Sequence, residues 1–194
     1  ATRLAEKIKQ QILSETGLVA SAGISYNKFF AKIASDMDKP DGLYLIPPQQ
    51  GLDFVAQLPI GKFHGVGKAT ERKMHALGIK NGADLRRFSY AVLQQHFGKA
   101  AWFYSQIAQG IDERPVKANR ESKSIGTETT YAHDLDDSRE IYRQLTELLD
   151  KALLKVSAKQ LCARTLTVKI KYHDFHQITR SLSFNRPIQK QLSS

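Results

Sequence analysis

The stretch LPIGKFHGVGKATERKMHALGI, residues 58–79, most restricts how this chain can fold. Two helical pieces flank Gly65-Val66-Gly67, and Gly78 follows the second piece. Glycine lets the backbone approach another group closely, and the unpaired N–H groups at a helix start attract anions. Lys68 adds a positive charge beside that start. The segment therefore predicts a helical hairpin that can hold a phosphate, in preference to an ordinary turn between packed helices.

The charge balance points to the same class of partner. The 194 residues include 29 Lys and Arg but only 19 Asp and Glu, which gives a formal net charge of +10. Such an excess favours a polyanion such as nucleic acid, although it also serves solubility alone. No apolar run approaches the roughly 20 residues that cross a bilayer, and residues 1–10 lack the apolar core of a signal peptide. A lone Cys162 suits a reducing compartment, so we expect a cytoplasmic protein with no membrane partner.

The first part of the chain alternates between helical and extended patterns. Residues 1–16 predict an amphipathic helix, and the short apolar runs at 18–24 and 43–46 predict strands. Ser25 is a candidate N-cap for the helix between those strands. The pattern indicates a β-α-β unit. Because the opening helix lacks a strand before it, we expect the chain to begin inside a domain.

The middle of the chain predicts a small helical domain. Pro47-Pro48 marks its start, and residues 51–110 contain several short helical patterns punctuated by glycine, with no strand alternation. The polar stretch at 111–122 then predicts a linker.

The last part predicts a sheet with the order β-α-β-β. Residues 124–131 predict a strand, 137–157 a helix with one apolar face, and 164–173 and 178–184 two further strands. The whole chain is therefore expected to be α+β and multi-domain. This last domain is expected to be incomplete, without its final helix and strand.

Three stretches together resemble the Y-family, or translesion, DNA polymerases. SAGISYNKFFAKIASDMDKPDG (21–42) resembles the palm segment that follows the paired metal-binding carboxylates of that family. Residues 58–79 resemble a helix-hairpin-helix motif, which binds DNA without regard to sequence. GIDERPV (110–116) and ESKSIGTETT (121–130) resemble the end of the thumb and the entry into the little finger. The resemblance implies the rest of a palm at 1–48, a helical thumb at 49–115 and a truncated little finger at 116–194.

The resemblance also implies roles for particular residues. Lys39 would contact the triphosphate of an incoming nucleotide, as a compact ammonium suits a phosphate cluster. The backbone carbonyls of Gly61, Phe63 and Val66 would hold K⁺ or Na⁺. The residues expected to contact DNA phosphates are Gly65, Val66, Gly67, Lys68, Ser124, Lys169 and Lys171.

The implied activity is template-directed addition of deoxynucleotides to a primer end, with two Mg²⁺ ions and error-prone copying. The partners would be primer–template DNA, a deoxynucleoside triphosphate and a sliding clamp. In the family the metal-binding carboxylates precede the segment that this chain begins with, so we expect no catalysis from this chain alone. The first alternative is a non-catalytic helix-hairpin-helix module. The second is a base-excision enzyme with Asp84 as its acid, although capping of a short helix explains Asp84 more simply.

Overall fold

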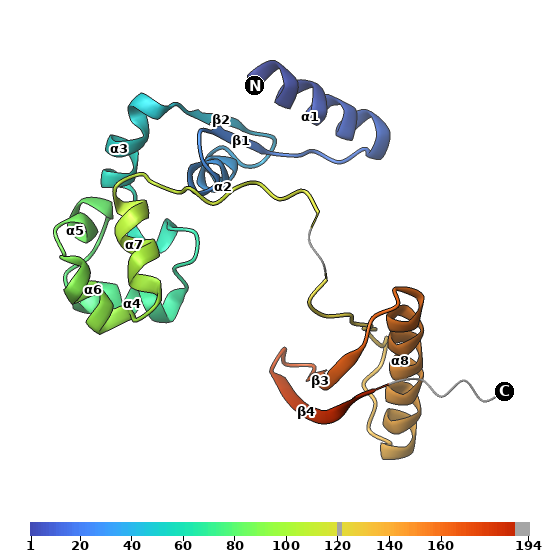
Figure 1. Cartoon of the computed structure of the whole chain (residues 1–194). Helices are drawn as coiled ribbons and strands as arrows, with labels where there is room; N and C mark the ends of the chain where they lie inside the picture. The colour runs from blue at the N-terminus through green and yellow to red at the C-terminus, as the bar shows by residue number, and fades with distance from the viewer. Residues whose placement is uncertain (120–121, 189–194) are drawn as a thin grey trace. The chain divides into compact units, whose positions relative to one another are not determined.

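The computed structural model of the protein describes residues 1–119 and 122–188 (Figure 1). Its internal contacts divide the chain into Ala1–Ala118 and Asn119–Ser194. Helices and separate small sheets occur in the chain, which confirms the predicted α+β class. The predicted boundary at 115–116 lies near the division between the units, whereas that at 48–49 falls inside the first unit. The three-domain scheme therefore stays a prediction.

The first unit opens with the predicted helix and β-α-β segment. Its elements are α1 (Thr2–Thr16), β1 (Ala22–Ser25), α2 (Lys28–Met37) and β2 (Leu43–Ile46). The two strands pair in parallel, from Ala22 opposite Leu43 to Ser25 opposite Ile46, which confirms the predicted unit. A parallel pair needs a crossover between its strands, and α2 supplies it.

The predicted cap of α2 is wrong. Ser25 remains in β1, where its hydroxyl donates to the Ile46 carbonyl at 2.8 Å. Asn27 caps the helix instead, since its side-chain oxygen accepts from the Phe30 N–H at 3.0 Å. Tyr26 and Asn27 thus separate the end of β1 from the first turn of α2.

Short helices make up the rest of the first unit, as predicted. They are α3 (Pro48–Gln57), the 3₁₀ turn η1 (Ile60–Lys62), α4 (Lys68–Ala76), α5 (Gly82–Arg86), α6 (Tyr90–Phe97) and α7 (Ala100–Ala108). One hydrophobic core joins them to the β-α-β segment. The rings of Phe29 on α2 and Phe63 after η1 lie 5.3 Å apart within this core. The palm-like segment and the hairpin are therefore packed as one body.

The start of the predicted linker is docked. Asp112 accepts from the Phe29 N–H at 2.9 Å, and its side chain is only 2% exposed. Arg114 donates to the same carboxylate from Nε at 2.6 Å and Nη2 at 2.8 Å. Lys28 also reaches the Pro115 carbonyl at 3.3 Å. Residues 111–115 thus fasten the end of α7 to the start of α2, and the linker prediction is wrong for them.

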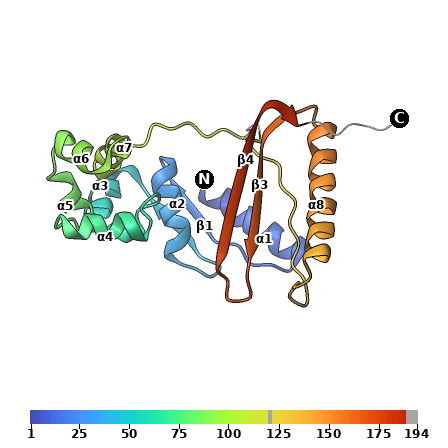
Figure 2. The same cartoon turned by 90° about the horizontal axis from the view of Figure 1, so that it is seen from below.

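The second unit consists of one long helix and a strand pair (Figure 2). The elements are α8 (Ser138–Ala158), β3 (Ala163–Lys171) and β4 (Gln177–Ile188). The strands are antiparallel, with Thr165 opposite Ser183 and Lys171 opposite Gln177. The helix and β3 lie where the sequence predicts them, and β4 extends four residues beyond the predicted end at 184.

The prediction of a strand at 124–131 is wrong. Within the described residues this segment pairs with no strand. The segment lies alongside α8 instead. The Thr127 hydroxyl donates to the Leu148 carbonyl at 2.7 Å, and the Tyr131 hydroxyl bonds the Gln144 side chain at 3.2 Å. The polar hydroxyls of this stretch find their partners on the helix, so the described part of this unit has the order α-β-β.

Candidate nucleic-acid interface

A tight turn sits at the centre of the hairpin. The Val66 N–H donates to the Phe63 carbonyl at 3.0 Å, and Gly65, the third residue of the turn, has φ of +97°. That backbone conformation is the one a type II turn requires at its third position. A side chain at Gly65 would also lie 3.4 Å from the Phe103 ring. The turn therefore favours glycine here because of its backbone conformation, whereas the contact with Phe103 leaves room for a small side chain.

The start of α4 presents free backbone donors. Gly67 occupies the N-cap position and offers no side-chain acceptor. The first helical bond runs from the Glu71 N–H to the Gly67 carbonyl at 2.9 Å. Within the described residues, the N–H groups of Lys68, Ala69 and Thr70 have no acceptor. A Cβ at Gly67 would meet nothing within 4 Å, so the space in front of these donors is open. An uncapped helix start of this kind binds anions.

Buried contacts hold the hairpin rigid behind this open face. Ile60, Phe63, Met74 and Ile79 are almost completely buried in the first unit. The Ile60 N–H also donates to the Lys80 carbonyl at 2.8 Å. Because these N–H donors are already held in place, they lose little conformational entropy when an anion binds.

The predicted cation ligands lie in one short stretch of the chain, in η1 and the turn that follows it. Gly61, Phe63 and Val66 follow one another through η1 and the turn, and the Phe63 carbonyl already accepts one hydrogen bond. A carbonyl oxygen has a second lone pair, so that bond leaves it able to bind a cation. The carboxylate of Glu71 lies against Gly61, where a Cβ would come within 2.0 Å of its Oε1. Neutral carbonyl oxygens beside a carboxylate fit a hard monovalent cation.

Lys68 is an exposed charge of the hairpin, but it has a partner. Its side chain is 90% exposed and its ammonium lies 3.1 Å from Glu71 Oε2. An exposed pair of this kind contributes little free energy, so the ammonium remains available to a stronger anionic partner. Lys62 and Arg72 are exposed on the same hairpin.

Lys39 lies just beyond the end of α2, half-exposed, and pairs with Asp36. Lys32 also bonds Asp36, and the two lysines, Lys32 first, lower the pKa of this carboxyl to about 2. Asp36 is thus an ionised surface group between two cations. Within the described residues, no group of three or more His, Cys, Asp or Glu side chains is placed to hold a metal ion.

Asp84 has the capping role that the sequence indicates. Its own N–H donates to the Asn81 side chain at 2.9 Å, and its carboxylate accepts from the Lys80 N–H at 3.0 Å. Both bonds fix the start of α5. A carboxylate occupied in this way has no evident task in catalysis.

The second unit carries the other predicted contacts. Lys169 and Lys171 are exposed on one face of β3, and the Lys171 ammonium lies 4.4 Å from the centre of the Phe175 ring. On the same face Thr167 and Ser181 share a hydrogen bond of 2.9 Å across the strands. Ser124 is exposed in the irregular segment before α8. The structure thus places the two lysines on one face of one strand, and Ser124 is not part of that strand.

The paired hydroxyls between the strands were not identified from the sequence. Thr165 bonds Ser183 at 2.8 Å, directly beside the pair formed by Thr167 and Ser181. The alternation of hydroxyl and apolar residues in both segments was the available signal, but the pairing depends on the strand register.

Three models of one protein family match most of the chain. The impB/mucB/samB family matches residues 1–36, its helix-hairpin-helix motif matches 48–79, and its C-terminal domain matches 122–193. The chain belongs to the impB/mucB/samB family. Within this family, the match at 48–79 confirms the helix-hairpin-helix identified from the glycine pattern.

Relatives of this family include named polymerases. The chain is 53% identical to a DNA polymerase IV of Alkalilimnicola ehrlichii and 52% identical to one of Gluconobacter oxydans, over 97% of its length in both cases. It covers 53% of each of them, so the chain spans about half the length of the curated relatives it matches.

Solved structures of the family agree. A Y-family DNA polymerase chimera matches with a TM-score of 0.80 and 31% identity, and DinB from Sulfolobus solfataricus with 0.58 and 30%. Each match covers 97% of this chain and 54% of the other. The resemblance to Y-family polymerases drawn from the sequence is confirmed. In the residues that the structure describes, no helix is long and apolar enough to cross a membrane.

Proposed function

We propose that this chain is the duplex-holding part of a template-directed translesion DNA polymerase. The observation that carries the proposal is the open, uncapped start of α4 behind a rigid glycine turn. Three free N–H groups lie at this helix start, and the exposed side chain of Lys68 belongs to its first residue, a combination that suits one backbone phosphate. None of these groups reads a base edge, so the contact is independent of sequence, as a polymerase requires.

The hairpin turn would hold a monovalent cation beside that phosphate. The carbonyl oxygens of Gly61, Phe63 and Val66 would be its ligands, and K⁺ or Na⁺ would be the ion. When bound, the cation would supply positive charge that attracts the phosphate. Glu71 lies against Gly61 and favours a cation there electrostatically.

The proposed role of Lys39 is to contact the triphosphate of an incoming deoxynucleotide. Its present partner Asp36 is exposed, so exchanging that ion pair for a multiply charged phosphate is favourable. The chemical step needs two Mg²⁺ ions. We assign their ligands to carboxylates outside the described residues, consistent with relatives about twice the length of this chain.

In the second unit, Lys169 and Lys171 would contact phosphates along the duplex from one face of β3. The hydroxyl pairs beside them extend the same polar face, and Ser124 would add a further hydroxyl. We further propose a sliding clamp as a partner of the whole polymerase, and the cytoplasm as its location, because these accompany the proposed activity.

The first test is binding of this chain to a primer–template duplex over a salt series. We expect affinity to fall with salt, and Lys68→Ala to bind more weakly than Lys7→Ala, which changes an exposed lysine on α1. Equal binding by the two variants would contradict the hairpin contact.

The second test is primer extension by a whole relative, the DNA polymerase IV of Alkalilimnicola ehrlichii, with the lysine aligned to Lys39 changed to alanine. We expect a raised KM for the nucleotide. An unchanged KM would remove the role of Lys39. Duplex binding without extension by the unaltered relative would favour a non-catalytic binding module.

A further inference from the structure

Lys9 belongs to α1, but its ammonium contacts the loop at 38–42, which joins α2 to β2. It donates to the main-chain carbonyls of Asp41 and Gly42, the second at 3.1 Å, and it lies 3.1 Å from Asp41 Oδ1. An ammonium has three N–H donors, and three oxygens are within their reach here. The Lys9 side chain is only 15% exposed. This lysine is therefore engaged with the protein itself and is not open to a phosphate.

The loop at 38–42 closes tightly on itself. A Cβ at Gly42 would lie 2.0 Å from the carbonyl oxygen of Asp38, the C-cap of α2, so glycine allows the two ends of the loop to approach. Between them, Asp41 has φ of +55°, a left-handed conformation that is uncommon for a residue with a side chain. Lys9 bonds both the carbonyl and the carboxylate of this residue, and so helps to hold that conformation.

The start of β1 holds the same loop from another side. The Gly42 N–H donates to the Ser21 hydroxyl at 3.2 Å, and the Ala22 N–H donates to the Gly42 carbonyl at 2.9 Å. The Gly42 carbonyl thus accepts from the start of β1 and from Lys9 of α1. Together with its attachment to the end of α2, the loop is fixed by three elements of the first unit.

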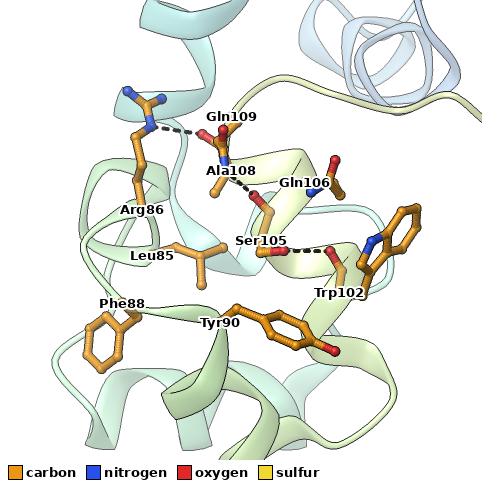
Figure 3. A pocket seen from close by; sticks show the side chains of 9 residues that line it. All are labelled: Leu85, Arg86, Phe88, Tyr90, Trp102, Ser105, Gln106, Ala108 and Gln109. Atoms are coloured by element: carbon orange, nitrogen blue, oxygen red, sulfur yellow. Dashed lines mark hydrogen bonds between the residues drawn. The ribbon is translucent and has the colours of Figure 1, made fainter.

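The largest hollow of the first unit uses polar side chains in a similar way (Figure 3). It measures about 290 Å³ and lies between α5, the start of α6 and α7. Three of its polar side chains donate to main-chain carbonyls: Arg86 to Ala108 at 3.0 Å, Ser105 to Trp102 at 2.8 Å and Gln109 to Ser105 at 3.4 Å. Because these side chains are bound to the backbone, the hollow does not by itself indicate a ligand. Lys9 differs from them in holding a loop that carries a proposed substrate contact.

That contact is Lys39, which directly follows the C-cap of α2. Its side chain is 57% exposed, and its ammonium pairs with the exposed Asp36 at 2.5 Å. Lys9 and Lys39 therefore have opposite surroundings. Lys9 is enclosed by acceptors of the loop, whereas Lys39 can exchange an exposed partner for a phosphate at little cost.

We propose that Lys9 is a positioning residue for nucleotide binding, because it fixes the loop from which Lys39 would reach the triphosphate. The inference rests on the proposed role of Lys39. A loop that is already held in one conformation loses little conformational entropy when its ligand binds. Without the bonds from Lys9, the loop would spend part of its time in other conformations, and the apparent affinity for the nucleotide would fall with the fraction that remains competent.

The first test measures amide hydrogen exchange in the full chain by NMR. Lys9→Met replaces the ammonium with an apolar side chain of similar length, and we expect the Gly42 N–H to exchange about tenfold faster, as loss of a bond to a charged group predicts. Lys7→Met, at an exposed position of the same helix, is the control and should leave this rate unaltered. The Ile79 N–H, which donates to the Met74 carbonyl in the core, should exchange equally in all three proteins. Equal rates at Gly42 in both variants, or an equal acceleration at Gly42 and Ile79, would overturn the local role.

The second test is primer extension by the DNA polymerase IV of Alkalilimnicola ehrlichii, with lysine at both positions aligned to Lys9 and Lys39. Changing the first of these lysines to methionine should raise the KM for the nucleotide about fivefold and alter kcat less than about twofold, since binding is affected and the chemical step is not. Arginine at that position keeps N–H donors there and should recover most of the loss.

A double variant separates positioning through Lys39 from any other effect of Lys9. With alanine at the position of Lys39, the methionine change should raise KM no further, because residues that act as one unit are not additive. A further increase of the same size, or an unaltered KM in the single methionine variant, would refute the positioning role while leaving the role of Lys39 intact. If alanine at the position of Lys39 leaves KM unaltered, the proposed triphosphate contact fails, and the inference about Lys9 fails with it.

Discussion

The carboxylate of Asp112 offers the sharpest test of how the first unit is held together. Replacing it with alanine removes the acceptor of the buried Phe29 N–H and both bonds from Arg114. An unsatisfied N–H at such a site costs about 1–3 kcal/mol. The pair with Arg114, whose side chain is 46% exposed, adds about 1 kcal/mol at most. We therefore expect Asp112→Ala to lower the free energy of unfolding by about 3 kcal/mol.

The assay is urea unfolding of the full chain, followed by the emission of Trp102, which lies in the first unit. With an m-value of about 1.5 kcal/mol/M, the loss corresponds to a midpoint lower by about 2 M. Glu113→Gln, at the neighbouring exposed position, is the control and should change the free energy by less than about 0.5 kcal/mol. If both variants unfold at the same urea concentration, the docking of residues 111–115 through Asp112 does not stabilise this unit.

The same carboxylate predicts a pH dependence. The bonds from Arg114 chiefly, with smaller help from the Phe29 N–H, lower the pKa of Asp112 below its usual value. A lowered pKa in the folded state means that the stabilisation is complete above the unfolded pKa and is lost as the pH falls below it. The ordinary aspartate pKa is near 3.9. The unaltered chain should therefore lose more of its free energy of unfolding between pH 5 and pH 2 than the Asp112→Asn variant does. Parallel pH profiles would refute the assignment.

The remaining predictions concern the DNA-binding surfaces. Lys68→Ala should weaken duplex binding about fivefold, because one charge pair in water contributes about 1 kcal/mol. It should also reduce the salt slope, the slope of the logarithm of the binding constant against the logarithm of the salt concentration, by about 1. Gly65→Ala should lower the free energy of unfolding by about 1–2 kcal/mol because Gly65 has a positive φ. Gly67→Ala should lower it by only about 0.5 kcal/mol. It should nevertheless weaken DNA binding, because its methyl group would fill the open space before the N–H groups of α4. Lys169→Ala and Lys171→Ala should each lower the salt slope by about 1 with stability unchanged. Fluorescence anisotropy with a labelled duplex and urea unfolding measure these effects; a Gly67→Ala variant that binds normally would contradict the proposed phosphate position.

Local patterns in the sequence predict much of this fold. The apolar run at 43–46 coincides with β2, and the glycine-punctuated stretch at 58–79 identifies the hairpin, because both signals depend on neighbouring residues alone. The cap of α2 was misplaced by two residues, since Ser25 and Asn27 are both good capping residues and only the length of β1 decides between them.

Contacts between distant residues account for what the sequence does not reveal. Residues 124–131 have strand-like composition, but a strand needs a neighbour, and here the hydroxyl of Thr127 bonds α8 instead. The docking of Asp112 on Phe29 joins residues 83 positions apart, and no local pattern indicates it. In the site, the approach of Glu71 to Gly61 is equally a matter of packing.

The ring contact between Phe29 and Phe63 has a consequence for the proposed function. It places α2, which leads to Lys39, and the turn proposed to bind a phosphate on one continuous core. A close-packed core does not deform continuously, so the spacing between these two points is constant. We expect the number of base pairs between the gripped phosphate and the incoming nucleotide to stay the same from one addition to the next. Under the proposed function, the duplex would then have to release the turn and advance by one whole step each time.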